Sequence, residues 1–280
     1  MGGLGNQLFQ IFTTLAYGFK HKRNIIFSYE EVLTTGMHRP TYWNTFLSYL
    51  KCYTNRTSDY YTNDYISNFP KYPEQGFKYS EIPNFEDYKE VMLYGYFQSY
   101  KYFESHKNEL FTLIKLSDYK NKMKTMYPQY FEDPYIISMH FRLGDYKTIQ
   151  QCHPIAPYEY YKTAMEEILT NRTNLQSHKV LYFCEYNDIA DVTIIIDKLI
   201  RDFDNVEFIR IDHSIPDWQQ MLLMSCCYDN IIANSSFSWW GSYFNQNENK
   251  IICYPHKWFG PSLSHDTVDL FPSEWKKIFW

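Results

Sequence analysis

The residues best suited to chemistry follow one short apolar segment, residues 136–139, and are His140, Arg142 and Asp145. Runs of apolar and β-branched residues are typical of buried parallel strands, and open α/β sheets bind ligands just beyond the carboxyl ends of their strands. The Arg142 guanidinium is always charged, and its donors match two phosphate oxygens, so it can hold and neutralise a diphosphate. The structural alternative is that Arg142 pairs with Asp145 to close a turn.

A second polar cluster, Ser235, Ser236 and Ser238, lies between another apolar segment, residues 230–234, and a predicted helix. Hydroxyls and the free N–H groups of a helix start complement an arginine in binding phosphate. The alternative is that these serines are ordinary N-caps, and that His140 is a core histidine.

The chain opens with the glycine-rich segment Gly2–Gly3–Leu4–Gly5 and continues through Asn6 and Gln7 into a predicted helix. Glycines let a ligand approach the backbone, and a helix start offers N–H groups to an anion. Such turns normally follow a strand, and almost nothing precedes Gly2. We therefore expect the first part of the chain to lack its usual first strand.

Strands alternate with helices along the chain, which predicts βαβ units and a parallel sheet. In the first half we expect a strand at 24–29, loops and small helices over 34–90, a strand at 91–99, and a polar boundary at 117–134. In the second half, helices are expected at 158–170 and at 188–203, where Asp188 is the N-cap. Further strands are expected at 179–184, 206–211, 230–234 and, as the last one, 251–255.

The composition limits the class of protein. With 280 residues and 45% hydrophobic residues, the chain suits one large or two moderate globular domains. A net charge of −5 argues against a nucleic-acid or anionic-membrane partner, which would require a basic face. No window approaches the roughly 20 apolar residues of a transmembrane helix. The six cysteines form no CxxC unit, which favours a reducing compartment, and we expect a soluble, cytoplasmic protein.

Four ordered motifs together resemble the α-1,2-fucosyltransferase family (glycosyltransferase family 11). They span the whole chain and are Gly2–Gln10, Tyr94–Ser99 with Tyr102-Phe103, His140–Tyr146 and Ile231–Gly241. His153 ahead of Tyr160-Tyr161, and Pro255 ahead of Trp258-Phe259, also fall where that family has similar residues.

The resemblance implies an α/β, GT-B-like fold of two Rossmann-type lobes with parallel sheets. Residues 1–125 would form the acceptor-side lobe and residues 126–280 the nucleotide-sugar-binding lobe. The donor would be GDP-fucose, with no metal and no cofactor. Asp202-Phe203-Asp204 spells the DxD of metal-dependent glycosyltransferases, but it falls at the end of a predicted helix, where we interpret it as a solvated terminus.

The resemblance also implies roles for single residues. Arg142 matches the arginine that grips the donor diphosphate, and His140 matches a histidine near the guanosine. Asn6, with Gly5 and Gln7 beside it, would face the donor, and Ser235, Ser236 and Ser238 would lie by the phosphates.

The implied reaction is an inverting transfer of L-fucose to the 2-hydroxyl of a galactose-type acceptor, a glycan read by the 34–90 region. Asp145 and His153 are both candidates for the general base, because deprotonation of a hydroxyl needs a carboxylate or an imidazole within reach.

The chain departs from the family pattern at Leu143, where a second arginine is usual, and at Gln219 and Gln220, where an acidic residue is frequent. If the N-terminus is truncated, membrane-associated or Golgi-type placement stays open. The alternatives are a transferase of another linkage or donor, or an inactive sugar- or nucleotide-binding homologue.

Overall fold

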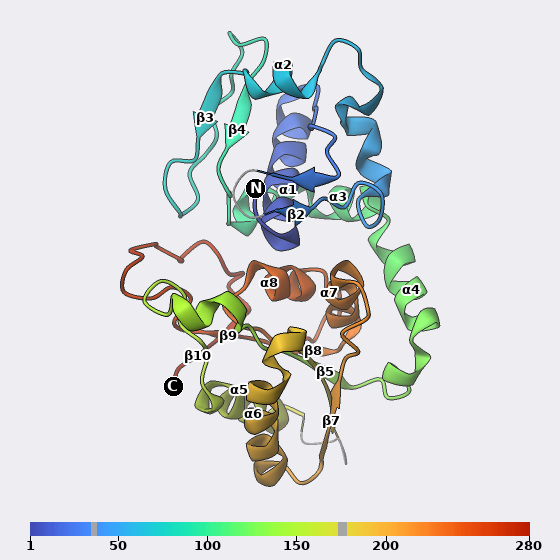
Figure 1. Cartoon of the computed structure of the whole chain (residues 1–280), viewed down its shortest axis with the longest axis vertical. Coiled ribbons are helices and arrows are strands. Elements are labelled where there is room, and N and C mark those ends of the chain that lie inside the picture. The colour runs from blue at the N-terminus through green and yellow to red at the C-terminus, as the bar shows by residue number, and fades with distance from the viewer. Residues whose placement is uncertain (35–37, 173–177) are drawn as a thin grey trace. The chain divides into compact units, whose positions relative to one another are not determined.

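The computed structural model describes residues 1–34, 38–172 and 178–280, and they form two compact units (Figure 1). Unit 1 comprises Met1–Ser117 and His265–Pro272, and unit 2 comprises Asp118–Ser264 and Ser273–Trp280. The late segment is held in unit 1 by Asp269, whose carbonyl accepts from Ser99 Oγ at 2.6 Å and whose carboxylate accepts from Tyr79 N at 3.2 Å. The sequence predicts a boundary after residue 125, and the first long segment of unit 1 ends at Ser117.

Unit 2 is built on one six-stranded sheet in which every strand is parallel to its neighbours. The strand order is β10-β9-β8-β5-β6-β7. All five residues of β5 are buried, because helices cover both faces of the sheet. Each fully buried large apolar side chain there contributes about 1.5–3 kcal/mol to folding. The strands are β5 (Ile136–His140), β6 (His178–Phe183), β7 (Val206–Arg210), β8 (Asp229–Ile231), β9 (Ile252–Pro255) and β10 (Lys276–Ile278).

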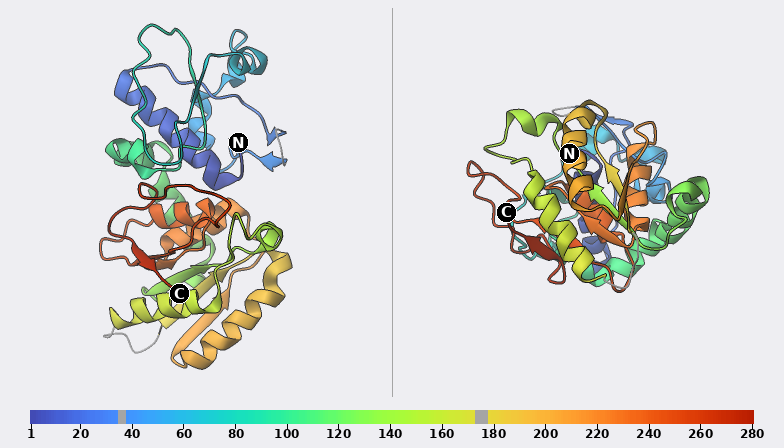
Figure 2. Two further views of the ribbon diagram at one scale, coloured as in Figure 1. Left: turned by 90° about the vertical axis from the view of Figure 1, so that its left-hand side faces the viewer. Right: turned by 90° about the horizontal axis from the view of Figure 1, so that it is seen from below.

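Helices α5 (Tyr158–Thr170) and α6 (Ile189–Asp202) pack side by side on one face of this sheet, and α7 (Asp217–Cys226) and α8 (Ser236–Tyr243) pack together on the other (Figures 1 and 2). The buried face of α6 carries Val192, Ile196 and Leu199 at helical spacing. The predicted parallel sheet and its crossover helices are therefore confirmed in unit 2. Short 3₁₀ helices fill the connections: η5 (Pro128–Tyr130), η6 (Gly144–Thr148) and η7 (Tyr186–Asp188).

Unit 1 is organised around helix α1 (Leu4–His21), whose apolar side chains are buried as their helical spacing predicts. Two small sheets accompany it: antiparallel β1 (Val32–Leu33) with β2 (Arg39–Pro40), and parallel β3 (Lys71–Pro73) with β4 (Met92–Tyr94). The remaining elements are η1 (Ser48–Tyr53), η2 (Asn55–Thr57), α2 (Asn63–Ser67), η3 (Tyr100–Tyr102), η4 (Glu104–His106) and α3 (Lys107–Leu113); α4 (Leu116–Met126) runs from unit 1 into unit 2.

Two expectations about single elements were wrong. The segment 24–29 forms only an isolated bridge, in which Phe27 is paired with Thr54, because no neighbouring strand extends the pairing. Residues 251–255 are not the last strand, since β10 pairs with β9 after a long loop. The polar segment 117–134, predicted as a boundary, contains most of α4 and the short η5.

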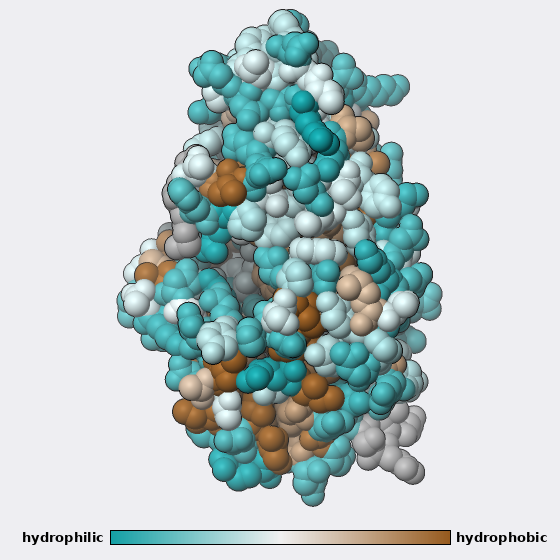
Figure 3. Space-filling view, turned by 45° about the vertical axis from the view of Figure 1, so that its right-hand side comes forward, coloured by the Kyte–Doolittle hydropathy of each residue, from teal (hydrophilic) through white to brown (hydrophobic). Residues whose placement is uncertain are grey.

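The surface seen in Figure 3 is mostly hydrophilic, with apolar side chains gathered on the part that belongs to unit 2. Two isoleucines of α6, Ile194 and Ile200, are among the exposed apolar residues of that unit. Across the described ranges 1–34, 38–172 and 178–280, no helix combines the length and the apolar character needed to cross a bilayer.

Candidate functional site

The candidate residues of unit 2 come together because three neighbouring strands end at one edge of the sheet. β5 lies between β8 and β6, and the register pairs Met139 with Ile231 and His140 with Phe183. The polar residues that follow these strands therefore project from the same carboxyl edge, where open α/β sheets bind their ligands. They are Arg142 after β5, Glu185 after β6 and Asn234 after β8.

Arg142 is the centre of this edge. Its two terminal nitrogens donate to two carboxylates, that of Asp145 in the same turn and that of Glu185. The guanidinium carbon lies 4.9 Å from the centre of the Tyr146 ring. Only 19% of the Arg142 side chain is exposed, against 45% for Asp145 and 55% for Glu185. Asp145 thus makes the pair with Arg142 that the sequence analysis gives as the structural alternative. Glu185 was missed, although an acidic residue directly after a predicted strand was a usable signal.

The Tyr146 ring joins Arg142 to His153. The His153 ring lies nearly parallel to that of Tyr146, with 4.7 Å between the ring centres, and 5.6 Å from the ring of Phe259. The Tyr146 hydroxyl donates to the carbonyl of Asn234 at 3.2 Å, and burial raises the pKa of this phenol. Arg142, Asp145, Tyr146 and His153 therefore form one continuous group of side chains.

His140, the last residue of β5, is buried and packs against Phe237, with 5.6 Å between the ring centres. Burial, and secondarily the positive charge of Arg142, lower the pKa of the imidazole to about 3, so the ring is neutral at physiological pH. Its Nδ1 atom finds no hydrogen-bond partner among the described residues. A neutral ring with an unpartnered nitrogen is suited to a hydrogen bond with an uncharged part of a ligand.

Asn234 is only 2% exposed, and among the described residues the nitrogen of its side-chain amide has hydrogen-bond partners while the oxygen does not. The amide nitrogen donates to the carbonyls of Pro154 and Trp258, at 2.9 and 3.1 Å, and so ties two loops to the end of β8. The Oδ1 atom is buried and, within the described ranges, has no donor. Since a buried polar atom normally has a partner, Oδ1 is a candidate acceptor for a ligand donor. Sequence reasoning did not select Asn234.

The three serines occupy different positions at the start of α8. Ser235 is the N-cap, and its side chain accepts from Phe237 N at 3.3 Å. Ser236 is half-buried in the first turn. Ser238 is fully buried, and its hydroxyl donates to the carbonyls of Ala233 and Ser235, both at 3.4 Å. The free N–H groups of this helix start are the part of the cluster best suited to an anion.

Gly5, Asn6 and Gln7 lie in unit 1, whereas the other candidate residues lie in unit 2. Helix α1 begins at Leu4, so all three are helical rather than part of the glycine turn. Asn6 accepts from Gln98 Nε2 at 2.9 Å, which brings the first two family-like motifs together. The Gln7 amide donates to the carbonyls of Gly2 and Pro40, at 3.0 and 2.9 Å.

The turn that carries Gln98 has a strained backbone, because Phe97 adopts a φ of +53°. Glu74 supports this turn: its Oε2 atom accepts from Tyr96 N at 2.8 Å, and burial raises the pKa of its carboxyl group. A Cβ on Gly95 would lie 2.4 Å from that of Glu74, so only glycine fits there. The 34–90 region, of which residues 35–37 lie outside the described residues, thus contributes to the environment of Asn6.

The departures from the family pattern have structural explanations. Leu143 is 5% exposed and belongs to the main apolar core of unit 2, so this position does not face the edge beside Arg142. Gln219 accepts from the Tyr127 hydroxyl at 2.6 Å, and Gln220 donates to the carbonyl of Ile215 at 2.7 Å.

The DxD-like sequence Asp202-Phe203-Asp204 lies at the end of a helix, as predicted. Asp202 is the last residue of α6 and pairs with Lys162 at 3.0 Å.

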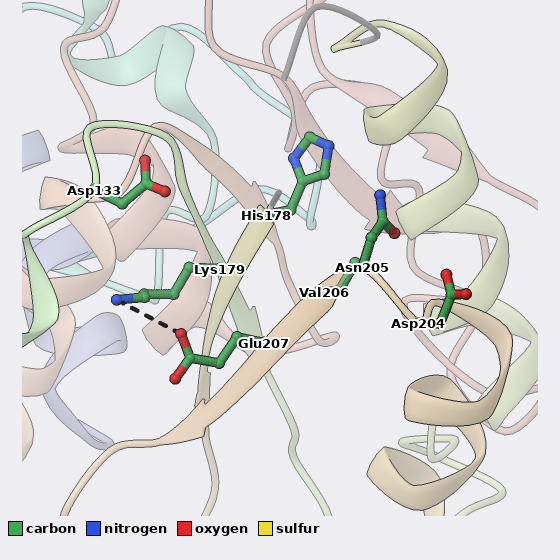
Figure 4. Close-up of a pocket in the computed structure, with 7 residues that line it drawn as sticks. All are labelled: Asp133, His178, Lys179, Asp204, Asn205, Val206 and Glu207. Atoms are coloured by element: carbon green, nitrogen blue, oxygen red, sulfur yellow. Dashed lines mark ion pairs between the residues drawn. The ribbon is translucent and has the colours of Figure 1, made fainter. Parts of the chain in front are cut away.

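A separate pocket lies at the amino-terminal ends of β6 and β7, the opposite end of these strands from Arg142 (Figure 4). An ion pair between Lys179 and Glu207, 3.7 Å apart, crosses it. It contains none of the predicted site residues; its lining is Asp133, His178, Lys179, Asp204, Asn205, Val206 and Glu207.

Comparisons with known proteins show that the whole chain is similar to glycosyltransferases. Residues 2–278 match the family described as Glycosyl transferase family 11. The O-antigen biosynthesis glycosyltransferase WbnK of Escherichia coli is 31% identical over 186 residues, which is 63% of this chain but only 58% of that protein. An alpha-1,2-colitosyltransferase of Escherichia coli is 24% identical over 294 residues, covering 99% of this chain and 96% of the relative.

Solved structures give more distant matches. NodZ alpha-1,6-fucosyltransferase soaked with GDP-fucose has a TM-score of 0.42 and 13% identity, over 85% of this chain and 88% of its own. Arabidopsis thaliana FUT1 in complex with GDP has a TM-score of 0.47 and 10% identity, over 97% of this chain and 73% of its own.

Proposed function

The chain belongs to glycosyl transferase family 11, and on this basis we propose that it transfers L-fucose from GDP-fucose to the 2-hydroxyl of a galactose-type acceptor. Membership makes the protein a glycosyltransferase, which acts on a glycan acceptor. The observation that carries the donor assignment is Arg142, a guanidinium held at the carboxyl edge of a parallel sheet between Asp145 and Glu185. Such a cation matches the diphosphate of a nucleotide sugar.

The proposed reaction is a single displacement at the anomeric carbon. The acceptor oxygen forms a bond to C1 of fucose on the face opposite GDP, and the bond from C1 to the β-phosphate oxygen breaks. The configuration inverts, GDP leaves with the bonding electron pair, and the acceptor proton passes to a base. Arg142 stabilises the charge that develops on the leaving diphosphate, a task that needs no metal ion in this proposal.

Asp145 and His153 remain the two proposed bases. The ion pair of Asp145 with Arg142 supports an orienting role for this carboxylate. His153 lies between the rings of Tyr146 and Phe259, which supports a fixed orientation for its imidazole. A base has to reach the acceptor hydroxyl, so exchange of the acting residue for one without a base should lower transfer by roughly 10²–10⁴-fold.

The nucleoside part of the donor is assigned to the buried atoms beside Arg142. Neutral His140 and the Oδ1 atom of Asn234, which have no partner in the part of the chain that the structure describes, offer two positions for hydrogen bonds with guanosine. Ser235 and Ser236, with the N–H groups at the start of α8, are proposed to lie by the phosphates. The buried hydroxyl of Ser238 would support this helix start, and Gly5, Asn6 and Gln7 are proposed donor contacts from unit 1.

A second candidate is α-1,2 transfer of a colitosyl residue. It is favoured by the match over 99% of the chain to a relative named as an alpha-1,2-colitosyltransferase. A further alternative is a homologue that binds GDP without transfer. Both alternatives use the same proposed nucleotide site. The first differs from the proposed function in the sugar that is transferred, and the second in the absence of turnover.

The test is a GDP-release assay with GDP-fucose and a panel of galactosides and other glycans, run in EDTA, with product linkage assigned by NMR. Acceptor-dependent release with an α-1,2-fucosyl product supports the proposal. Arg142→Met should lower transfer by roughly 10²–10³-fold, the effect of removing one transition-state donor. Arg201→Met, an exposed arginine in the last turn of α6, is the matched control. Normal transfer by Arg142→Met would remove Arg142 from the mechanism.

A cytoplasmic location is part of the proposal. All six cysteines are unpaired, as expected for a protein of a reducing compartment. Fractionation of cells that express the protein tests this location, and recovery of the protein with membranes would contradict it.

A further inference from the structure

Asp188 stands at the N-cap position of α6 but does not cap the helix. α6 begins at Ile189, and the Asp188 side chain accepts no hydrogen bond from the first turn. An aspartate at this position normally accepts from an N–H group of that turn. The Asp188 carboxylate instead accepts from Gly144 N at 2.7 Å and from Lys147 Nζ at 2.7 Å. Asp188 is 1% exposed, whereas the Lys147 side chain is 39% exposed.

Both donors belong to η6, the turn that directly follows Arg142. Gly144 opens this turn with a φ of +39°, and Lys147 is in its last part. Between them lie Asp145 and Tyr146, the two η6 residues that contact the Arg142 guanidinium. Asp188 therefore holds the turn on both sides of the residues that orient Arg142.

The electrostatics argue against a role for Asp188 in contact with the donor. A carboxylate repels a diphosphate, and this one is buried with its charge compensated by Lys147. Lys147 also pairs with Asp191 at 2.7 Å, and the Asp191 side chain is 54% exposed. Lys147 would therefore keep a carboxylate partner, Asp191, without Asp188. By contrast, no other described carboxylate accepts a hydrogen bond from Gly144 N.

We infer that Asp188 is a positioning residue for the donor diphosphate: it holds η6 so that Asp145 and Tyr146 present Arg142 to the phosphates. The inference rests on the proposed function of Arg142. It predicts that a change at Asp188 weakens binding of the diphosphate and leaves binding of the nucleoside unchanged. A residue that only stabilised unit 2 would affect both ligands alike.

The experiment measures GDP and guanosine binding by calorimetry for the full chain. Asp188→Ala should weaken GDP binding about tenfold, as expected for a lost buried hydrogen bond to a charged group. Asp188→Asn keeps an acceptor for Gly144 N and should weaken it only about threefold, because a neutral bond is roughly half as strong. Asp191→Asn, the matched control, removes the charge of the other carboxylate that pairs with Lys147 and should leave GDP binding unchanged. Guanosine affinity should stay within about twofold in all three.

Unchanged GDP binding by both Asp188 variants, or an equal loss for GDP and guanosine, would overturn the inference. If Asp188→Ala does not fold, the difference between Asp188→Asn and Asp191→Asn decides. Arg142→Met tests the proposed function separately from the inference about Asp188. If this variant binds GDP with unchanged affinity, the proposed role of Arg142 fails. Hydrogen exchange of the Gly144 amide tests the hold on η6 without a ligand, and equal exchange in Asp188→Asn and Asp191→Asn would contradict it.

Discussion

Replacing Glu185 with glutamine should tighten GDP binding. Glu185 and Asp145 each accept a hydrogen bond from one terminal nitrogen of Arg142, so a diphosphate that engages these nitrogens competes with both carboxylates. Asp145 is three residues from Arg142 in the same turn, whereas Glu185 comes from the end of another strand and is the more exposed of the two. Glu185 is therefore the carboxylate that can move aside, and it competes with the phosphates until it does.

The size of the effect follows from the exposure of the pair. The Glu185 side chain is 55% exposed and that of Arg142 is 19% exposed, so solvent screens much of their attraction. An ion pair of this kind contributes roughly 1 kcal/mol. Since 1.4 kcal/mol corresponds to a tenfold change in affinity, Glu185→Gln should lower the dissociation constant of GDP about fivefold. Guanosine has no phosphate, so its affinity should not change.

The assay is calorimetric titration of the unchanged protein, Glu185→Gln and Glu207→Gln with GDP and with guanosine at one ionic strength. Glu207→Gln is the matched control, because it removes the same charge from a 64% exposed side chain that pairs with Lys179 and does not contact Arg142. An unchanged or weaker GDP affinity of Glu185→Gln would refute the reasoning. Glu185 would then support Arg142 in the bound state instead of competing for it.

Two predictions concern stability. Leu143→Arg, which restores the arginine usual in the family, should lower the free energy of unfolding by about 3 kcal/mol or more, because Leu143 is a core residue and a guanidinium there loses its hydration. Denaturant unfolding measures this free energy, and a stable, more active Leu143→Arg variant would contradict the prediction. His140 has a pKa of about 3 in the folded state against about 6.5 unfolded, so its neutral form stabilises the fold fully above pH 6.5, and this contribution is lost as the pH falls toward 3. His140→Gln should reduce the acid slope of the unfolding free energy by up to about 1.4 kcal/mol per pH unit, and equal slopes for both proteins would count against a buried neutral ring.

Local patterns in the sequence were sufficient for the elements that bury one regular face. The apolar run of β5 and the helical spacing of α1 and α6 predicted these elements, and the predicted α/β class with a parallel sheet is confirmed in unit 2. Among the described residues, unit 1 has only two-stranded sheets, β1 with β2 and β3 with β4. The sequence also predicted His140, Arg142 and Asp145 together after one strand and His153 as a candidate base in the loop that follows. The roles of these residues stay proposals.

Local patterns failed where a short segment depends on a distant partner. The segment 24–29 has strand-like composition, but only Phe27 finds a bridge. β10 has too few apolar residues to be recognised, yet it becomes a strand because the edge of β9 offers free hydrogen-bonding groups. Asp188 fits the pattern of an N-cap, but its carboxylate is drawn to the N–H group and the cation of η6.

The sequence by itself determined which residues could serve chemistry at the ends of strands, because residue type and periodicity are local properties. The tertiary structure decided which of them are engaged with one another. Glu185 meets Arg142, 43 residues away, because β5 and β6 pair in one register, and Gln98 meets Asn6 across 92 residues. A shift of that register by one residue would turn every side chain of the shifted strand to the other face of the sheet. Contacts of this kind are fixed only when the strands pair and pack, so no local pattern could have specified them.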